Sequence, residues 1–167
     1  MSASEGKVTV VRTKLRQLVA ADHDVVFEMM ADPVAVRMAA FTAEDPGDRA
    51  AFDAHLARTS KIVGARHWAV VNDNDELVGT ISTFPSEVGC PEVTYWIVRE
   101  HWGQGHATEA LRLVLAQTER PVRARAAADN VASRRVLEKV GFIVVGQDTG
   151  FANARKAQIE EVILRLE

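Results

Sequence analysis

Stretches of two different hydrophobic periodicities alternate along this chain. Short runs rich in β-branched and aromatic residues are typical of strands, and apolar residues spaced three and four positions apart are typical of helices. The predicted strands are residues 8–18, 67–71, 76–84, 92–98, 122–126, 142–145 and 158–166. Helices are predicted between them, over residues 22–32, 45–59, 106–120 and 130–140.

Capping residues and prolines set the limits of the early helices. Asp22 or Asp24 can cap the first helix, which should end before Pro33 because proline disfavours helical backbone in the residue before it. Asp45 and Pro46 form a good N-cap and first-turn pair for the second helix. The resulting order, β-α-α-β-β-β-α-β-α-β-β, predicts a mixed sheet with helices on both sides. Residues 7–167 are expected to form one domain after a short tail, residues 1–6.

A strand, a glycine turn and a helix follow one another in the middle of the chain. Gly103 and Gly105 separate the strand at 92–98 from a helix whose apolar face is Ala107, Ala110, Leu111, Val114 and Leu115. This arrangement collects unpaired backbone N–H groups at a helix N-terminus, where a phosphate can bind. The alternative is a plain turn, since G-x-G alone is a weak motif. The P-loop is excluded because no Lys follows the second glycine, and the dinucleotide-binding fingerprint because Thr108 stands at its third small position with no clear acidic partner downstream.

Composition narrows the class of protein. Apolar residues make up 47% and charged residues 26% of the 167 positions, as in ordinary globular proteins. The formal net charge of −3, from 20 basic and 23 acidic residues, argues against nucleic acid as the main partner. The only cysteine, Cys90, excludes an internal disulfide, and no histidine has metal-ligand spacing, so we expect no metal. No signal peptide or membrane span is indicated, so a cytoplasmic protein is expected.

Two segments resemble signatures of the GNAT superfamily of N-acetyltransferases. The first, W-G-Q-G-H-A-T-E-A from Trp102, resembles its Q/R-x-x-G-x-G/A acetyl-CoA motif, with Trp102 in place of the usual Gln or Arg. The second, N-V-A-S-R-R-V-L-E-K-V-G-F from Asn130 to Phe142, is similar to the corresponding segment of the Rim-type branch, which acetylates ribosomal-protein N-terminal alanines. The resemblance covers nearly the whole chain. It implies a mostly antiparallel, twisted sheet of about seven strands, splayed between the fourth and fifth, with about four helices on both faces.

The resemblance also implies a site for acetyl-CoA, the acyl donor. The pyrophosphate would rest on the glycine turn, and the pantetheine arm would enter beside a β-bulge that we place at Trp96–Val98. The cofactor-binding residues implied are Trp96, Ile97, Val98, Gly103, Gln104, Gly105, His106, Ala107, Thr108, Asn130 and Ser133. Asn130 can equally serve as a helix N-cap. His101 and His106 are expected to be exposed loop residues rather than acid–base groups.

The chemistry implied is attack of an amine on the thioester, which needs a base, an oxyanion donor and a proton for the thiolate. Glu92 aligns with the family's frequent base, and a backbone N–H near Trp96 could bind the oxyanion. Many members protonate the thiolate with a tyrosine on the last helix, where this chain has Leu137, which cannot donate a proton. Ser133 is therefore the candidate acid, against the alternative of helix packing, and Tyr95 is expected to pack in the core.

Proton availability favours one class of acceptor. An α-amine with a pKa near 7.7–8.0 is roughly 10–15% neutral at pH 7, whereas a lysine amine is below about 0.1% neutral. A modest base would therefore suit a protein or peptide N-terminus. The alternatives are a small-molecule acetyltransferase acting on an amino acid, polyamine or aminosugar, and a non-catalytic acyl-CoA sensor. Phe41 and Phe84 are candidates for the acceptor cleft, and the protein is expected to be a monomer or homodimer with no membrane partner.

Overall fold

A seven-stranded sheet runs through the centre of the protein in the computed structural model, which describes residues 12–167. The strand order is β1-β2-β3-β4-β5-β7-β6, and every neighbouring pair is antiparallel except β4 and β5. The strands are β1 (Lys14–Gln17), β2 (Arg66–Val71), β3 (Leu77–Phe84), β4 (Glu92–Ile97), β5 (Val122–Ala127), β6 (Ile143–Ala152) and β7 (Ala157–Leu166).

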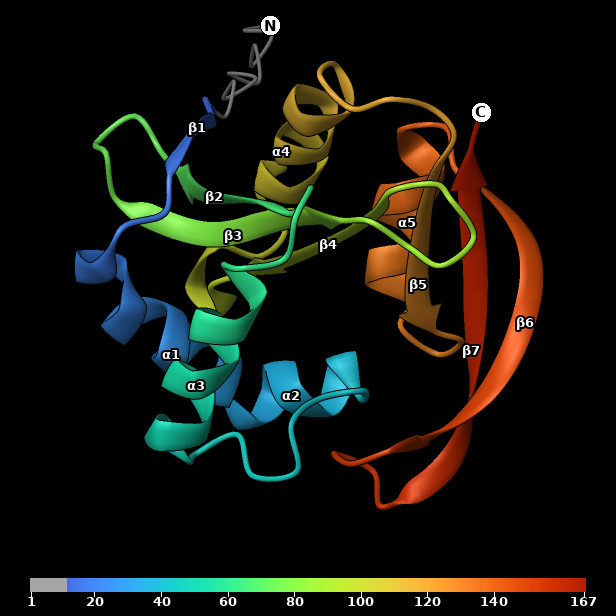
Figure 1. The fold of residues 1–167 in the computed structure, drawn as a ribbon, viewed down its shortest axis with the longest axis horizontal. Helices are drawn as coiled ribbons and strands as arrows, with labels where there is room; N and C mark the ends of the chain where they lie inside the picture. The colour runs from blue at the N-terminus through green and yellow to red at the C-terminus, as the bar shows by residue number, and fades with distance from the viewer. Residues whose placement is uncertain (1–11) are drawn as a thin grey trace, which may run out of the picture.

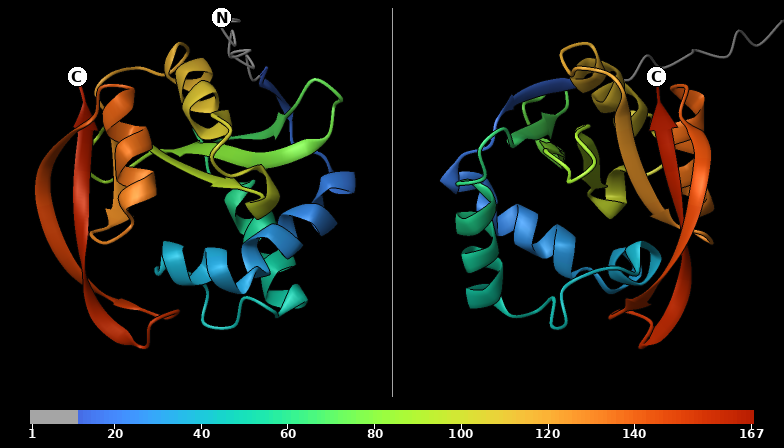
Figure 2. Two further views of the ribbon diagram at one scale, coloured as in Figure 1. Left: turned by 180° about the vertical axis from the view of Figure 1, so that it is seen from behind. Right: turned by 45° about the vertical axis from the view of Figure 1, so that its right-hand side comes forward.

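Five α-helices cover the two faces of the sheet. They are α1 (His23–Ala31), α2 (Pro33–Ala39), α3 (Arg49–Thr59), α4 (His106–Leu115) and α5 (Val131–Lys139). Helices α4 and α5 lie on one side, and α1, α2 and α3 lie on the other (Figures 1 and 2). The predicted architecture, a mostly antiparallel sheet with helices on both faces, is therefore confirmed.

The main core lies between the sheet and helices α4 and α5. Leu111 and Val114 of α4 are fully buried, and Leu137 of α5 is 1% exposed. They pack with Val93 of β4 and with Phe142, the residue after α5. This is the apolar face that the helical periodicity predicted for α4, and its burial fixes the N-terminus of that helix at the end of β4.

Strands β4 and β5 touch at one end only. Glu92 and Arg123 are their single pair of Cα partners, and the Arg123 N–H donates to the Pro91 carbonyl at 2.8 Å. Beyond this point the strands diverge, which confirms the predicted splaying of the sheet. The prediction of a β-bulge at Trp96–Val98 is wrong, because β4 pairs with β3 in constant register from Glu92 to Ile97. The gap comes from the divergence of the two strands.

Helix α2 was not predicted, because Asp32-Pro33 both ends one helix and begins another. The Asp32 carboxylate accepts the N–H groups of Val34 at 3.0 Å and Ala35 at 3.1 Å, which caps α2. Pro33 then occupies the first turn, where its missing N–H costs nothing.

The start of α3 and the length of β6 also differ from the prediction. Asp48 rather than Asp45 caps α3, through the Ala51 N–H at 3.0 Å, while Asp45 closes a turn on the Gly47 N–H. Strand β6 is ten residues long rather than four, since it pairs with β7 along its length. The predicted tail and the first part of the strand at 8–18 lie outside the described residues, and the remainder of that strand is β1.

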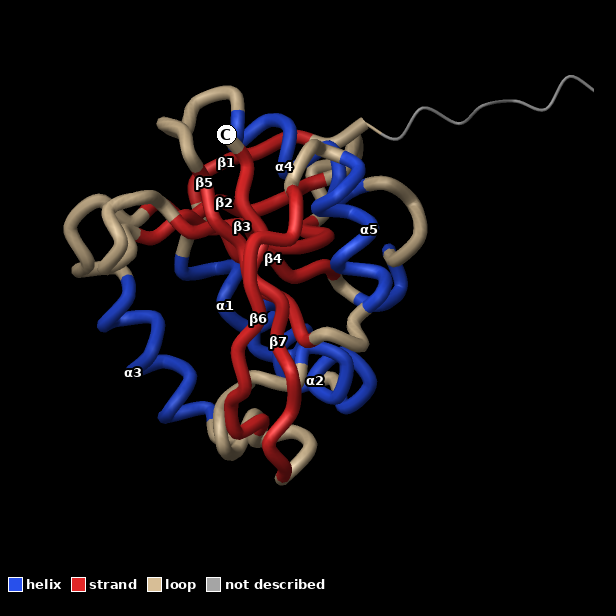
Figure 3. Tube along the Cα trace, turned by 90° about the vertical axis from the view of Figure 1, so that its right-hand side faces the viewer, coloured by secondary structure: helices blue, strands red, loops and turns tan. Residues whose placement is uncertain are grey.

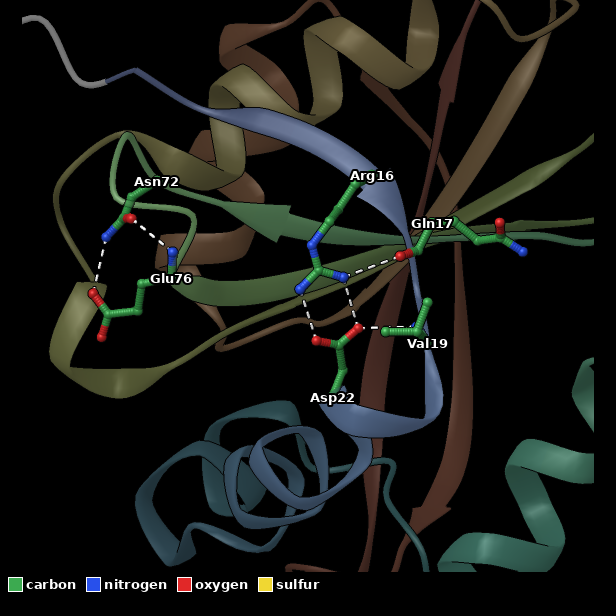
Figure 4. A network of polar contacts seen from close by, with 6 residues as sticks. All are labelled: Arg16, Gln17, Val19, Asp22, Asn72 and Glu76. Carbon is green, nitrogen blue, oxygen red and sulfur yellow. Dashed lines mark hydrogen bonds and ion pairs between the residues drawn. The ribbon is translucent and has the colours of Figure 1, made fainter.

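An ion pair joins β1 to the start of α1. Arg16 donates to the two carboxylate oxygens of Asp22 at 2.7 and 2.8 Å, and Asp22 also accepts the Val19 N–H at 2.9 Å (Figure 4). Asp22 is 6% exposed. The hydrogen bonds from Arg16 lower the pKa of Asp22 from its usual value, although burial acts in the opposite direction.

Replacing Asp22 with asparagine is expected to destabilise the protein by about 2 kcal/mol at pH 7, because it leaves Arg16 without its carboxylate partner. The folded-state pKa is below the unfolded value of about 3.9, so the stabilisation is complete above pH 4 and is lost as the pH falls through the folded pKa. Thermal denaturation of both proteins should therefore show a gap at pH 7 that closes in acid.

The matched control is Glu109→Gln, which removes an exposed ion pair with Arg112 on α4. Exposed pairs contribute little, so this variant should melt close to wild type. Equal losses in the two variants would contradict a special role for the Arg16–Asp22 pair.

Candidate functional site

The N-terminus of α4 presents free backbone N–H groups. Gly103 and Gly105 have φ angles of +72° and +90°, and a Cβ on either would meet no atom within 4 Å. The first N–H of this segment with an acceptor is that of Glu109, which donates to the Gly105 carbonyl at 3.1 Å. Within residues 12–167, no hydrogen bond uses a backbone N–H from residues 103–108. These amides are free to bind an anion, and the helix dipole favours one there.

The gap between β4 and β5 opens beside this turn. The Val98 N–H donates to the Val78 carbonyl of β3 at 2.8 Å. Because N–H directions alternate along a strand, the Trp96 N–H also points to β3, whereas those of Tyr95 and Ile97 face the gap. The indole N–H of Trp102 donates to the Ile97 carbonyl at 2.8 Å. The backbone of Tyr95 and the N–H of Ile97 therefore remain open to a ligand lying in the gap.

A cavity of about 630 Å³ joins the turn and the gap. Side chains alternate along β4, so Tyr95 lies on the α5 face with the buried Val93, while Glu92 and Trp96 face the other side, toward α2. The cavity is accordingly lined by β4, β5, the α4 turn and α5, and also by Met38 of α2.

A hydroxyl pair lies on the α5 wall of this cavity. The Ser133 Oγ is 2.8 Å from the Tyr95 hydroxyl, and the Ser133 N–H donates to the Asn130 side-chain oxygen at 3.2 Å. Asn130 is thus the N-cap of α5. Burial raises the pKa of Tyr95 to about 12, although its hydrogen bond to Ser133 acts in the opposite direction. The Tyr95 phenol therefore keeps its proton at neutral pH.

Three carboxylates surround one guanidinium on the opposite wall. Arg125 of β5 lies 3.1 Å from Glu161, 3.6 Å from Asp148 and 3.8 Å from Glu92. Arg125, Glu161 and Glu92 line the cavity. Because two carboxylates that line the cavity face one guanidinium, this wall favours a cationic ligand.

His106 is buried, so the expectation that it is an exposed loop residue is wrong. It is 4% exposed, and its Nδ1 lies 2.9 Å from the Thr13 hydroxyl. Burial lowers its pKa, and the neighbouring His101, 5.8 Å away between ring centroids, lowers it further. The His106 side chain is therefore neutral at pH 7, and attraction of an anion to this turn comes from the backbone.

The cavity brings together most of the residues selected from the sequence. Its lining includes Phe41, Glu92, Trp96, Ile97, Gly103, Gly105, His106, Ala107, Thr108, Asn130 and Ser133. Val98, Gln104 and Phe84 are not among the lining residues. Val98 directs its N–H to β3, Gln104 donates to the Glu100 carbonyl at 3.3 Å, and the Phe84 ring packs edge-on against His67.

The segment around α2 contacts the β6–β7 hairpin, whose tip reaches past α2 (Figure 3). The Asn153 side chain donates to the Thr42 carbonyl at 2.8 Å, and Arg155 donates to the Arg37 carbonyl at 2.8 Å. The ring of Phe41 packs so closely on Gly150 that an added Cβ there would lie 3.1 Å from it. Phe41 therefore forms a fixed wall of the cavity.

Tyr95, Arg125 and Glu161 were not identified as site residues from the sequence. The periodicity of β4 correctly placed Tyr95 against the core, but not its hydroxyl against Ser133. Arg125 and Glu161 carry no motif, since they meet only when β5 pairs with β7. Within residues 12–167, no group of three or more His, Cys, Asp or Glu side chains is placed to hold a metal. None of the helices in that range is long and apolar enough to cross a bilayer.

Comparisons with known proteins give a consistent match. The sequence matches the family of acetyltransferase (GNAT) domains over residues 12–143. It is 23% identical to the uncharacterized N-acetyltransferase p20 of Bacillus licheniformis over 164 residues, covering 93% of this chain and 92% of that one.

Two solved structures share the fold. The phosphinothricin acetyltransferase of Sinorhizobium meliloti, in complex with AcCoA, has a TM-score of 0.76 at 15% identity, covering 92% of this chain and 87% of that one. The Mycobacterium smegmatis RimJ, in complex with CoA-disulfide, has a TM-score of 0.75 at 19% identity, covering 93% and 84%.

Proposed function

The chain belongs to the GNAT acetyltransferase family, and from that premise we propose that it transfers the acetyl group of acetyl-CoA to the α-amine of a peptide or amino acid. The family membership confirms the resemblance found in the glycine turn and in the Asn130 segment. The protein is an N-acetyltransferase that uses acetyl-CoA as its acyl donor. The α-amine acceptor is the proposed part.

The observation that carries this proposal is the set of free amides beside the split strands. The unpaired N–H groups of residues 103–108 suit a pyrophosphate, and the open backbone at Tyr95 and Ile97 suits the amide groups of pantetheine. The positive φ angles and the open space at Gly103 and Gly105 would let the diphosphate approach closely. The residues present therefore fit acetyl-CoA.

Two side chains supply the proposed acid–base chemistry. Glu92 lies at the closed end of the gap, where β4 and β5 still pair, and its side chain is 32% exposed, so water can relay a proton to it. Ser133 lines the same cavity from α5, and its hydroxyl is the proposed donor to the leaving sulfur. Glu92 lies on one face of β4, and Tyr95, which contacts Ser133, lies on the other. The amine would therefore approach from the Glu92 face, and the thiol would leave toward the Ser133 face.

Charge and proton availability support an α-amine acceptor. The excess of carboxylates around Arg125 would attract the ammonium form of the acceptor. An α-amine then loses its proton to a modest base, since roughly 10–15% is already neutral at pH 7. A lysine side chain would need a much stronger base.

The test is a thiol-release assay with acetyl-CoA against matched panels of amines. We expect turnover with free α-amines of peptides or amino acids, and none when the same α-amine is blocked. Turnover confined to polyamines or aminosugars would overturn the α-amine acceptor. Saturable acetyl-CoA binding without turnover on any amine would overturn catalysis and favour an acyl-CoA sensor.

A further inference from the structure

We propose that Tyr95 is a positioning residue that donates its phenolic proton to the Ser133 Oγ and so turns the serine hydroxyl toward the leaving sulfur. The inference rests on the proposed function and concerns the same site. It begins from the 2.8 Å contact between the two hydroxyls, which come from β4 and α5.

The direction of the hydrogen bond follows from the chemistry of the pair. A phenol is a stronger acid than an aliphatic alcohol, so Tyr95 is the better donor. Its other acceptor, the Ser133 carbonyl, lies at 3.3 Å, beyond the usual range for an O–H bond. The Tyr95 proton therefore belongs on the Ser133 Oγ, which leaves the serine's own proton free to point elsewhere.

The Ser133 hydroxyl lines the cavity, and its own proton has no acceptor among residues 12–167 once Tyr95 is the donor. Among residues 12–167, Tyr95 is the only hydrogen-bond partner of the Ser133 Oγ. The backbone of Ser133 is held by the Asn130 cap, at 3.2 Å, so the hydroxyl cannot move away with the helix end. An oxygen that accepts a hydrogen bond becomes a better donor of its own proton, because linked hydrogen bonds polarise one another. Tyr95 thus compensates for the weak acidity of serine.

The Tyr95 side chain is held in a fixed position next to Ser133. Its ring packs against the main core, and its position on β4 fixes it beside the gap. Leu137, also on α5, is 1% exposed and carries no hydroxyl. Leu137 therefore cannot supply the proton that reaches the sulfur, and Ser133 is the donor on α5 that lines the cavity.

The proposed acetyl transfer accounts for each bond and proton. The amine nitrogen bonds to the thioester carbon, the C–S bond breaks, and its electron pair stays on sulfur. The nitrogen loses two protons in all: the ammonium proton goes to Glu92 before attack and from there to water, and the second goes to water once the C–N bond has formed. The Ser133 hydroxyl gives its proton to the sulfur and is reprotonated by water, while Tyr95 keeps its proton throughout.

A double-mutant cycle with Tyr95→Phe and Ser133→Ala tests this role. Tyr95→Phe keeps the ring and removes only the hydroxyl. We expect it to lower kcat about 3- to 10-fold, the effect of one hydrogen bond, with the KM and Kd for acetyl-CoA within about 2-fold of wild type. Ser133→Ala should lower kcat at least about 10-fold. In the Ser133→Ala background, Tyr95→Phe should change kcat by less than about 2-fold, because the hydroxyl it positions is gone.

Ser82→Ala is the matched control. It removes a hydroxyl bonded to His67 at 2.9 Å on β3, away from the cavity lining, and should leave kcat unchanged. Ser133→Thr keeps a hydroxyl, so in the Ser133→Thr background Tyr95→Phe should again lower kcat, although by less than in the wild type.

Three results would overturn the role of Tyr95. The first is an equal loss from Tyr95→Phe with and without Ser133, which would indicate a structural role. The second is weaker acetyl-CoA binding in Tyr95→Phe that accounts for the whole loss. The third is full activity in Ser133→Ala with none in Tyr95→Phe, which would make Tyr95 the acid itself. A wild-type protein that binds no acetyl-CoA or acetylates no amine would instead overturn the proposed function.

Discussion

Gly105→Glu is expected to weaken acetyl-CoA binding by at least about 100-fold, or roughly 2.7 kcal/mol, in a protein that still folds. A side chain at Gly105 meets no atom of the protein within 4 Å and would project from the turn that lines the cavity. The glutamate would place a negative charge where the free amides of residues 103–108 would otherwise hold a diphosphate. Calorimetric titration with acetyl-CoA measures the effect directly.

The control for this prediction is Gly105→Ala. The φ of +90° strains any residue with a Cβ by about 1–2 kcal/mol, so alanine and glutamate should lower the melting temperature by similar amounts. Only glutamate adds charge and length, so only glutamate should weaken binding by about 100-fold or more. A folded Gly105→Glu protein with wild-type affinity would mean that the pyrophosphate binds elsewhere.

Glu92→Gln is expected to lower kcat about 100-fold at pH 7, within the range for loss of a general base. The amide keeps the shape of the side chain and removes its proton affinity. The loss should shrink as the pH rises toward the pKa of the acceptor, near 8 for an α-amine, because neutral amine then becomes plentiful without a base. Steady-state rates from pH 6 to pH 9 provide the comparison.

Glu161→Gln is the control that distinguishes a role of Glu92 as a base from a general effect of negative charge in the cavity. Glu161 lies closer to Arg125 than Glu92 does, at 3.1 Å against 3.8 Å, and lines the same cavity. Its loss should change the KM for the acceptor more than kcat. If both variants lose kcat equally at every pH, Glu92 acts only through its charge.

The helices and strands nearest the site were predicted well, because their signals are local. The glycines of the turn, the apolar face of α4 and the Asn130 cap of α5 each depend on residues within a few positions of one another. The family motif added the acyl donor, which no periodicity could provide. Boundaries that depend on competing caps were predicted less well. Asp48 caps α3 in place of Asp45, and Asp32 caps a helix that was not predicted, since the cap is the carboxylate that reaches a free N–H.

The prediction of a β-bulge at Trp96–Val98 was wrong for a different reason. The predicted effect, a gap that admits a ligand, is present, but its cause is the divergence of β5 from β4. The sequence of β4 does not determine the direction of β5, which begins 25 positions after β4 ends. The direction of β5 is set by its pairing with β7 and by the helices packed against it.

The sequence by itself determined the family and the turn between β4 and α4, and its resemblance to that family indicated the candidate acid and base, because these signals lie in contiguous residues and short spacings. Only the tertiary structure decided that Tyr95 meets Ser133, that Arg125 lies among three carboxylates, and that the segment around α2 contacts the β6–β7 hairpin. These contacts join residues from separate strands and helices. Their distances depend on sheet register and helix packing, which arise only when the whole core is buried together.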